Sequence, residues 1–127
     1  LKTSKNKYLL FIEIKPTFSK KLLQKLLKET SNYTKCVFIS FKHKNIYNLL
    51  KIKSNTKVGL SFSNSTSAKM VIKKSNNKQI DYLILDKSFL KNKNIQNLKI
   101  KKYYYTIKNK SEFNKYNKNN NLIFENL

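Results

Sequence analysis

Lysine supplies all 28 basic residues of this chain, and only six acidic residues oppose them, which leaves a net charge of +22 on 127 residues. A compact domain with this charge repels itself, so it must either tolerate the repulsion or have it neutralised by a polyanion. Nucleic acid is the commonest such polyanion, and dispersed lysines contact phosphates without reading bases. The charge therefore predicts nucleic-acid binding.

A second interpretation attributes part of the lysine content to base composition. Eighteen asparagines, one glycine, one proline and no arginine or tryptophan together indicate coding DNA poor in G and C. Such drift explains lysine in place of arginine, but it favours neither sign of charge, because Glu and Asp codons are also frequent in such DNA. The chain begins at Leu1 rather than Met, which suggests a processed start or a non-standard initiation codon. These features predict a mitochondrial protein encoded by the organelle; the alternative is the cytoplasm of an organism with an AT-rich genome.

Length and composition limit the broad class of protein. The length allows one domain with a modest core, and a hydrophobic content of 39% with eight Tyr and eight Phe argues against a purely disordered basic tail. The single cysteine, Cys36, excludes an internal disulfide, and one His with one Cys cannot make a zinc site. No apolar run approaches the roughly 20 residues that span a bilayer, so no membrane insertion is expected.

Alternating and helical patterns of apolar residues divide the chain into elements. Residues 7–15 predict a strand ended by Pro16, and 19–31 predict a helix, capped by Thr17 or Ser19, with a leucine face and a lysine stripe. The order of elements predicts a ferredoxin-like β-α-β-β-α-β fold of the α+β class, with two helices on one face of a four-stranded sheet. The remaining predicted elements are extended segments at 36–41, 45–53, 68–74, 80–85 and 99–107 and a second helix at 88–98.

The stretch between the second and third strands of this fold predicts a long hairpin arm over about 42–79. Its tip lies at 54–67, where small polar residues leave too few apolar side chains for a core. The arm is therefore expected to leave the globule and to be ordered by what it touches. Residues 1–108 are expected to form a single ferredoxin-like RNA-binding domain, followed by a C-terminal extension over 109–127.

Catalytic chemistry finds little support in the residue pattern. His43 lies between Lys42 and Lys44, so a base there would be surrounded by positive charge, and the six acids are scattered without a close carboxylate pair. Cys36 is expected to be a small core residue rather than a nucleophile, and the one glycine, Gly59, cannot build a phosphate-binding loop. The sequence predicts a protein that is not an enzyme, with no cofactor, no metal and no small-molecule substrate.

Two segments carry a family resemblance. The first, FIEIKPTFSKKLLQKLLKE (11–29), has a strand ending in the basic residue Lys15, a short turn, and a Leu22-Leu23 pair that opens a helix. The second, NIYNLLKIKSNTK (45–57), runs from an aromatic-aliphatic stretch into a polar tip. Both resemble the corresponding parts of the family of small ribosomal subunit protein ten, the NusE family. The resemblance implies a protein of the small-subunit head, here an organellar version, whose hairpin penetrates ribosomal RNA beside neighbouring ribosomal proteins.

The predicted function is therefore that of a structural constituent of the ribosome, which neutralises RNA phosphates through its arm. Two alternatives stay open. One is an RNA-recognition or single-strand-binding module that stacks bases on Tyr103–Tyr105; the other is an accessory, protein-binding subunit of a large organellar complex. The predicted RNA-binding residues are Lys42, His43, Lys44, Lys51, Lys53, Ser54, Asn55, Lys57, Lys69, Lys73 and Lys74.

Overall fold

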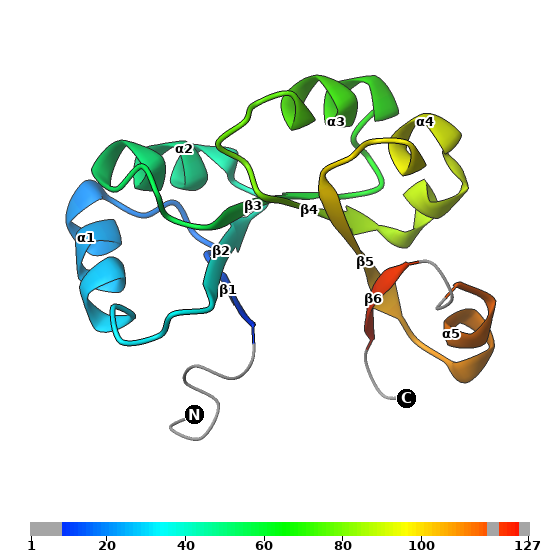
Figure 1. Cartoon of the computed structure of the whole chain (residues 1–127), viewed down its shortest axis with the longest axis horizontal. Helices are drawn as coiled ribbons and strands as arrows, with labels where there is room; N and C mark the ends of the chain where they lie inside the picture. The colour runs from blue at the N-terminus through cyan, green and yellow to red at the C-terminus, as the bar shows by residue number, and fades with distance from the viewer. Residues whose placement is uncertain (1–8, 117–119, 125–127) are drawn as a thin grey trace. The chain divides into compact units, whose positions relative to one another are not determined.

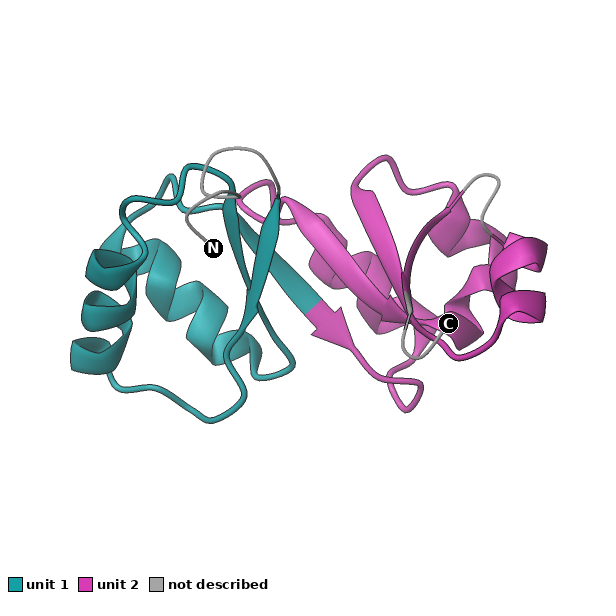
Figure 2. Ribbon diagram, turned by 90° about the horizontal axis from the view of Figure 1, so that it is seen from below, with its two compact units in different colours: residues 1–60 teal, residues 61–127 magenta. Residues whose placement is uncertain are grey.

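Strands and helices alternate along the chain. The structure, a computed structural model, describes residues 9–116 and 120–124. It divides into two compact units, residues 1–60 and 61–127, which Figure 2 draws in different colours. The boundary falls inside the strand β3 (Val58–Phe62).

Unit 1, residues 1–60, consists of parallel β/α repeats. β1 (Leu10–Glu13) pairs with β2 (Cys36–Ser40), and β2 pairs with β3, in both cases parallel. α1 (Lys20–Glu29) connects the first pair and α2 (His43–Ile52) the second, and both helices lie on the same side of the strands (Figure 1). Parallel neighbours need such crossovers, because the chain must return to the end of the sheet from which it started.

Unit 2, residues 61–127, repeats this arrangement with shorter helices. β4 pairs with β5 and β5 with β6, again in parallel, with an irregularity in the second register. The elements of this unit are α3 (Ala68–Ser75), β4 (Tyr82–Asp86), the 3-10 helix η2 (Lys87–Lys91), α4 (Lys93–Gln96), β5 (Lys101–Ile107), α5 (Lys110–Tyr116) and β6 (Asn121–Phe124).

The predicted ferredoxin-like fold is wrong. That fold is built on antiparallel pairs, whereas the strand pairs described within the two units are all parallel. The predicted C-terminal tail over 109–127 is also wrong, because this segment contains α5 and the strand β6, which pairs with β5. The chain therefore belongs to the α/β class, in which each strand is followed by a crossover.

The long hairpin arm predicted over 42–79 does not exist in the structure, which forms α2, β3 and α3 there. The segment predicted as a strand at 45–53 belongs to α2. Its apolar residues Ile46, Leu49 and Leu50 recur at i, i+3 and i+4, which is the helical spacing, and all three are buried. Helical periodicity outweighs the strand-like composition of this segment.

The segment predicted as a strand at 68–74 is the helix α3. Ser67 is the N-cap of this helix, because its hydroxyl accepts a hydrogen bond from the backbone N–H of Met70 at 3.2 Å. A serine immediately before a helix supplies one of the acceptors that the first turn lacks. Val71 is the buried residue of this helix, while Met70 is 41% exposed.

The strand β3 occupies the centre of the predicted polar tip, 54–67. All five of its residues are buried, although Gly59 and Ser61 alternate with Val58, Leu60 and Phe62. Strands of parallel sheets are covered on both faces, so small residues of such a strand are buried together with its apolar ones. The tip prediction was wrong because it counted these small residues as loop composition.

Several elements agree with the sequence. The helix predicted over 19–31 is α1, and the Ser19 hydroxyl accepts from the Leu22 N–H at 3.3 Å, as its predicted cap. Leu23 is fully buried. β2, β4 and β5 match the strands predicted at 36–41, 80–85 and 99–107, whereas the helix predicted at 88–98 is split into η2 and α4. Residues 7–8 of the first predicted strand lie outside the described residues.

Candidate functional site

The carboxyl ends of parallel strands are where β/α folds place their ligand-binding side chains, because the loops at these ends meet at one edge. In unit 1 this edge is formed by the loop 14–19 after β1 and by Phe41 and Lys42 after β2. The register places Glu13, the last residue of β1, opposite Ile39, one residue before the end of β2. The two loops therefore begin side by side.

A buried hydroxyl, that of Ser40, ties these two loops together. It donates to the carbonyl oxygen of Ile14 at 2.5 Å and accepts from the backbone N–H of Lys42 at 3.1 Å. It also accepts from the side-chain amide of Asn45 at 3.4 Å. A hydroxyl has one hydrogen and two lone pairs, so Ser40 uses its full capacity for hydrogen bonds.

Asn45 extends the network to the far part of the loop after β1. Its Nδ2 donates to the carbonyl oxygen of Pro16 at 2.8 Å, and its Oδ1 accepts from the backbone N–H of Phe18 at 2.9 Å. Asn45 and Ser40 are both 0% exposed. Buried polar groups cost free energy unless they are satisfied, and satisfied networks make the local structure rigid. The network thus holds the loop after β1 against the first turn of α2.

Charged and titratable side chains lie on, and directly next to, the loops that this Ser40–Asn45 network holds. Glu13 and Lys15 are both exposed, and because they are two residues apart in extended chain they share a face. Lys42 is exposed and His43 is half-buried at the start of α2. Unit 1 therefore places a carboxylate, two ammonium groups and an imidazole at the ends of two neighbouring strands.

The corresponding edge of unit 2 surrounds a cavity of about 480 Å³. Lys87 donates to Glu112 Oε2 at 2.7 Å, and the backbone N–H of Lys108 donates to Glu112 Oε1 at 3.3 Å. Asp86, the last residue of β4, accepts from the N–H of Ser88 at 2.9 Å. The charge of Lys87 is thus neutralised inside the unit, and Asp86 and Glu112 together balance the charges of Lys87 and Lys91 in the cavity lining, so this edge offers less to an anion. The cavity is lined by Asn64, Asp86, Lys87, Ser88, Lys91, Glu112 and Tyr116.

Hydrogen bonding and burial shift the pKa of several groups. The hydrogen bond from Lys87 lowers the pKa of the Glu112 carboxyl below its ordinary value of 4.5, and the Lys108 N–H adds to this effect. Burial raises the pKa of the Cys36 thiol and raises that of the Tyr104 hydroxyl to about 12. A thiol whose pKa is raised stays protonated at neutral pH, which makes Cys36 a weak nucleophile.

The structure separates the predicted RNA-binding residues of unit 1. The group at 42–44 lies at the start of α2, at the carboxyl edge, and Lys51 lies in the last turn of that helix. The group at 53–57 lies in the turn before β3, at the amino end of that strand. Lys53, Asn55 and Lys57 line a small cavity there, of about 140 Å³. The two groups face opposite ends of the strands, so they do not form one hairpin tip.

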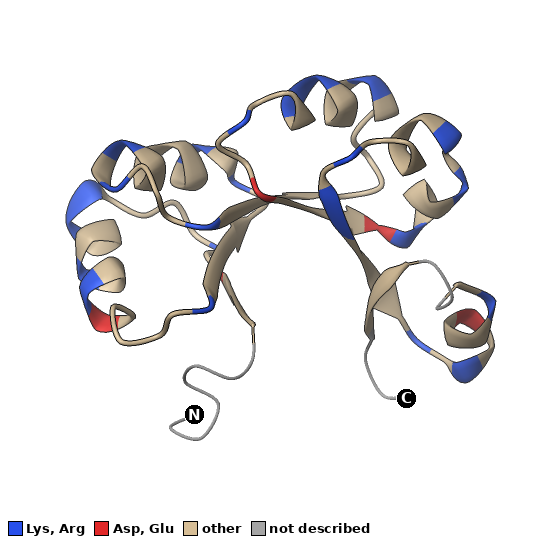
Figure 3. Cartoon of the chain, viewed as in Figure 1, with Lys and Arg blue, Asp and Glu red and all other residues tan. Residues whose placement is uncertain are grey.

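The remaining predicted residues, Lys69, Lys73 and Lys74, belong to α3 in unit 2. Lys69 and Lys73 are exposed and Lys74 is half-buried. Lysines are spread over the helices and loops of both units, and acids are few (Figure 3). Over the ranges 9–116 and 120–124, no group of three or more His, Cys, Asp or Glu side chains gathers as a metal ion would require. None of the helices in these ranges is long and apolar enough to cross a membrane.

Sequence reasoning missed Glu13 and Lys15 as site residues. The sequence contains a signal for them, because the apolar run of β1 ends in charged residues immediately before Pro16. In a parallel sheet such residues lie at the ligand-binding edge, but an antiparallel prediction attaches no meaning to that end. Asn45 was missed because it was assigned to a strand.

Comparison with known proteins finds a solved structure with a similar fold. No family model matches the chain, and no curated protein matches its sequence. The crystal structure of a glycerophosphodiester phosphodiesterase from Parabacteroides distasonis matches 91% of this chain with a TM-score of 0.64 and 13% identity. The match covers 52% of that protein, so the chain spans about half its length. At this identity the match shows the fold alone, which is parallel and TIM-barrel-like.

This match overturns the resemblance to the NusE family. That resemblance rested on the order of elements and on the segments 11–29 and 45–57. The first segment forms a strand and a helix, a combination common to many folds. The second is mostly the helix α2 and not a hairpin.

Proposed function

We propose that this chain binds a phosphodiester group at the carboxyl edge of unit 1, with Lys15 and Lys42 facing the phosphate charge. The observation that carries the proposal is the Ser40–Asn45 network, which fixes the two loops that bear these lysines. Ammonium groups bind phosphate oxygens as compact point charges, and charge-assisted hydrogen bonds of this kind are strong. The fold relative, by its name a glycerophosphodiester phosphodiesterase, supports this class of ligand.

The other polar groups of the edge suit the organic part of such a ligand. A carboxylate such as that of Glu13 accepts hydrogen bonds from hydroxyl groups, which a glycerol moiety carries. His43 adds an imidazole at the start of α2. The proposal assigns a small-molecule ligand to a chain for which the sequence predicts no small-molecule substrate, and the predicted absence of catalysis stays a prediction.

The test is binding of glycerophosphocholine, followed by titration calorimetry, to the unaltered chain and to the Lys15→Gln variant. A charged hydrogen bond contributes about 1.5–3 kcal/mol, so the variant should bind about ten- to a hundredfold more weakly. Release of glycerol phosphate or choline, measured in the same samples, reports whether the bond is also cleaved.

The matched control is Lys35→Gln. Lys35 is also exposed, but it precedes β2 and therefore lies at the opposite end of the strands. The Lys35→Gln substitution should leave the affinity for glycerophosphocholine unchanged. Equal weakening by the two variants would mean that the ligand responds to overall charge, and the edge would then not be the site.

RNA binding is a second candidate function, and the net charge of +22 is the observation that favours it. The charge is independent of the ribosomal family assignment, so this candidate survives the loss of that assignment. The mitochondrial location predicted from composition stays a prediction.

A further inference from the structure

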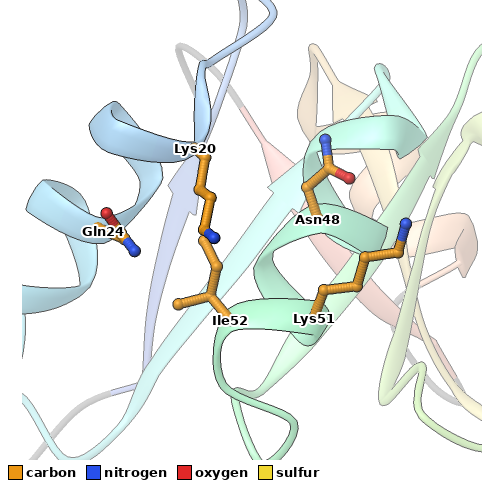
Figure 4. A pocket seen from close by; sticks show the side chains of 5 residues that line it. All are labelled: Lys20, Gln24, Asn48, Lys51 and Ile52. Carbon is orange, nitrogen blue, oxygen red and sulfur yellow. The ribbon is translucent and has the colours of Figure 1, made fainter.

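A groove between α1 and α2 of unit 1 combines positive charge with amide groups. It has a volume of about 440 Å³ and is lined by Lys20 and Gln24 of α1 and by Asn48, Lys51 and Ile52 of α2. Figure 4 shows the side chains of the two helices on either side of this groove. Its lining thus offers two ammonium groups, two amides and a single apolar side chain.

The charge of this groove is not neutralised by an ion pair within residues 9–116 and 120–124. Neither Lys20 nor Lys51 forms an ion pair with an acid in the ranges that the structure describes. α2 contains no acidic residue, and the one acid of α1, Glu29, lies 4.0 Å from Lys25. Two ammonium groups that line one groove without a counter-charge raise the local potential, which attracts anions.

The positive surface continues along α1. A second hollow, of about 500 Å³, shares Gln24 with the groove and is lined also by three lysines and by Ser19 and Leu22; the lysines are Lys21, Lys25 and Lys28. These three lysines form the lysine stripe of the helix predicted over 19–31. Together with Lys20 and Lys51 they form what we call the α1–α2 lysine surface.

We infer that the α1–α2 lysine surface binds the phosphate backbone of RNA, with the groove between Lys20 and Lys51 receiving one stretch of the strand. This inference rests on RNA binding, the second candidate function. A row of ammonium groups matches regularly spaced phosphates, and the amides of Gln24 and Asn48 can bond to phosphate or sugar oxygens, which carry no sequence information. A recessed groove lined by amides fits a strand better than it fits a flat lipid surface.

The inference is tested by fluorescence anisotropy of a labelled 20-nucleotide single-stranded RNA over a salt series, with the full chain and with the Lys20→Gln/Lys51→Gln variant. Each lost phosphate contact should reduce the slope of log affinity against log salt by about 0.7 on a single strand. The variant should therefore lose about 1.4 units of slope, with no change of sequence preference. The Lys20→Arg/Lys51→Arg variant, which keeps both charges, should keep the slope.

The matched control is Lys91→Gln/Lys93→Gln, which removes the same charge from exposed positions of η2 and α4 in unit 2. Equal loss of slope in both glutamine variants would overturn the inference, because the charge would then act diffusely. Absence of RNA binding by the unaltered chain at low salt would remove the second candidate function itself. Binding to phosphatidylserine vesicles without binding to RNA would also overturn the inference and assign the surface to membranes.

Discussion

Units 1 and 2 are built from the same parallel strands and crossovers, and each contains fourteen of the 28 lysines. They differ in how they hold the loops at the carboxyl ends of their strands. Unit 1 uses two uncharged, fully buried side chains, Ser40 and Asn45. Unit 2 uses an ion pair between Lys87 and Glu112, whose side chains are 37% and 27% exposed.

This difference decides which edge has charge to offer a ligand. Neutral hydrogen bonds hold the loops of unit 1, so Lys15 and Lys42 are not needed to hold them. In unit 2 one of the two lysines that line the edge cavity, Lys87, is already paired with a carboxylate. The strength of an exposed ion pair also depends on salt and pH, whereas a buried neutral network depends little on either. The unit 1 edge should therefore keep its shape over a wider range of conditions.

The largest effect is expected from the apolar packing of α1 in unit 1. Leu23 of α1 is fully buried, while its neighbour Leu22 is 48% exposed. Leu23→Ala should lower the free energy of unfolding by about 2–5 kcal/mol, because it leaves a cavity. Leu22→Ala should change it by less than about 0.5 kcal/mol. Urea denaturation measures both, and similar losses in the two variants would contradict the packing of α1.

A smaller effect is expected when the unit 1 network is broken. Asn45→Ala removes the partner of the half-buried Phe18 N–H and of the carbonyl of the exposed Pro16. An unsatisfied group that is shielded from water costs about 1–3 kcal/mol. Hydrogen exchange should show faster exchange of the Phe18 amide. The cost should be the same in high salt, since no charge is lost.

Asn48→Ala is the matched control for that change, because Asn48 lies one turn further along α2, at the lysine groove. It should leave the Phe18 amide protected. If Asn45→Ala also left that amide protected, the network would not be what holds the loop, and the contrast between the units would fail.

The smallest effect is expected from the ion pair of unit 2. Hydrogen bonds from Lys87 and Lys108 lower the pKa of Glu112 below 4.5 in the folded protein. The stability that Glu112 contributes is therefore fully present above pH 4.5 and is lost as the pH falls through the lowered folded-state pKa. Glu112→Gln should remove this part of the acid dependence, measured by thermal unfolding over a pH series.

Glu29→Gln gives the comparison in unit 1. Glu29 lies 4.0 Å from Lys25 at an exposed i, i+4 pair, which contributes little. Its replacement should leave the acid dependence nearly unchanged. An equal change in both variants would mean that Glu112 has no special role in holding the unit 2 edge.

Helices, strands and net charge that depend only on neighbouring residues or on composition could be predicted from the sequence. The helix α1 follows from its leucine spacing and its Ser19 cap, and the strands β2, β4 and β5 follow from short apolar runs. The net charge, and with it the attraction of anions, is also a property of composition alone. The helix α2 could also have been predicted from the sequence, because the spacing of Ile46, Leu49 and Leu50 is helical.

Only the tertiary structure decided the direction of the strands and the place of the site. Whether neighbouring strands run parallel depends on pairing between residues far apart in the chain, such as Leu10 with Cys36, and a local pattern of apolar residues is the same for either direction. Because the strands are parallel, Glu13 and Lys15 lie at the same carboxyl edge of unit 1 as the start of α2. Asn45 reaches Pro16, 29 positions away in the chain, only because the crossover α1 brings β2 beside β1.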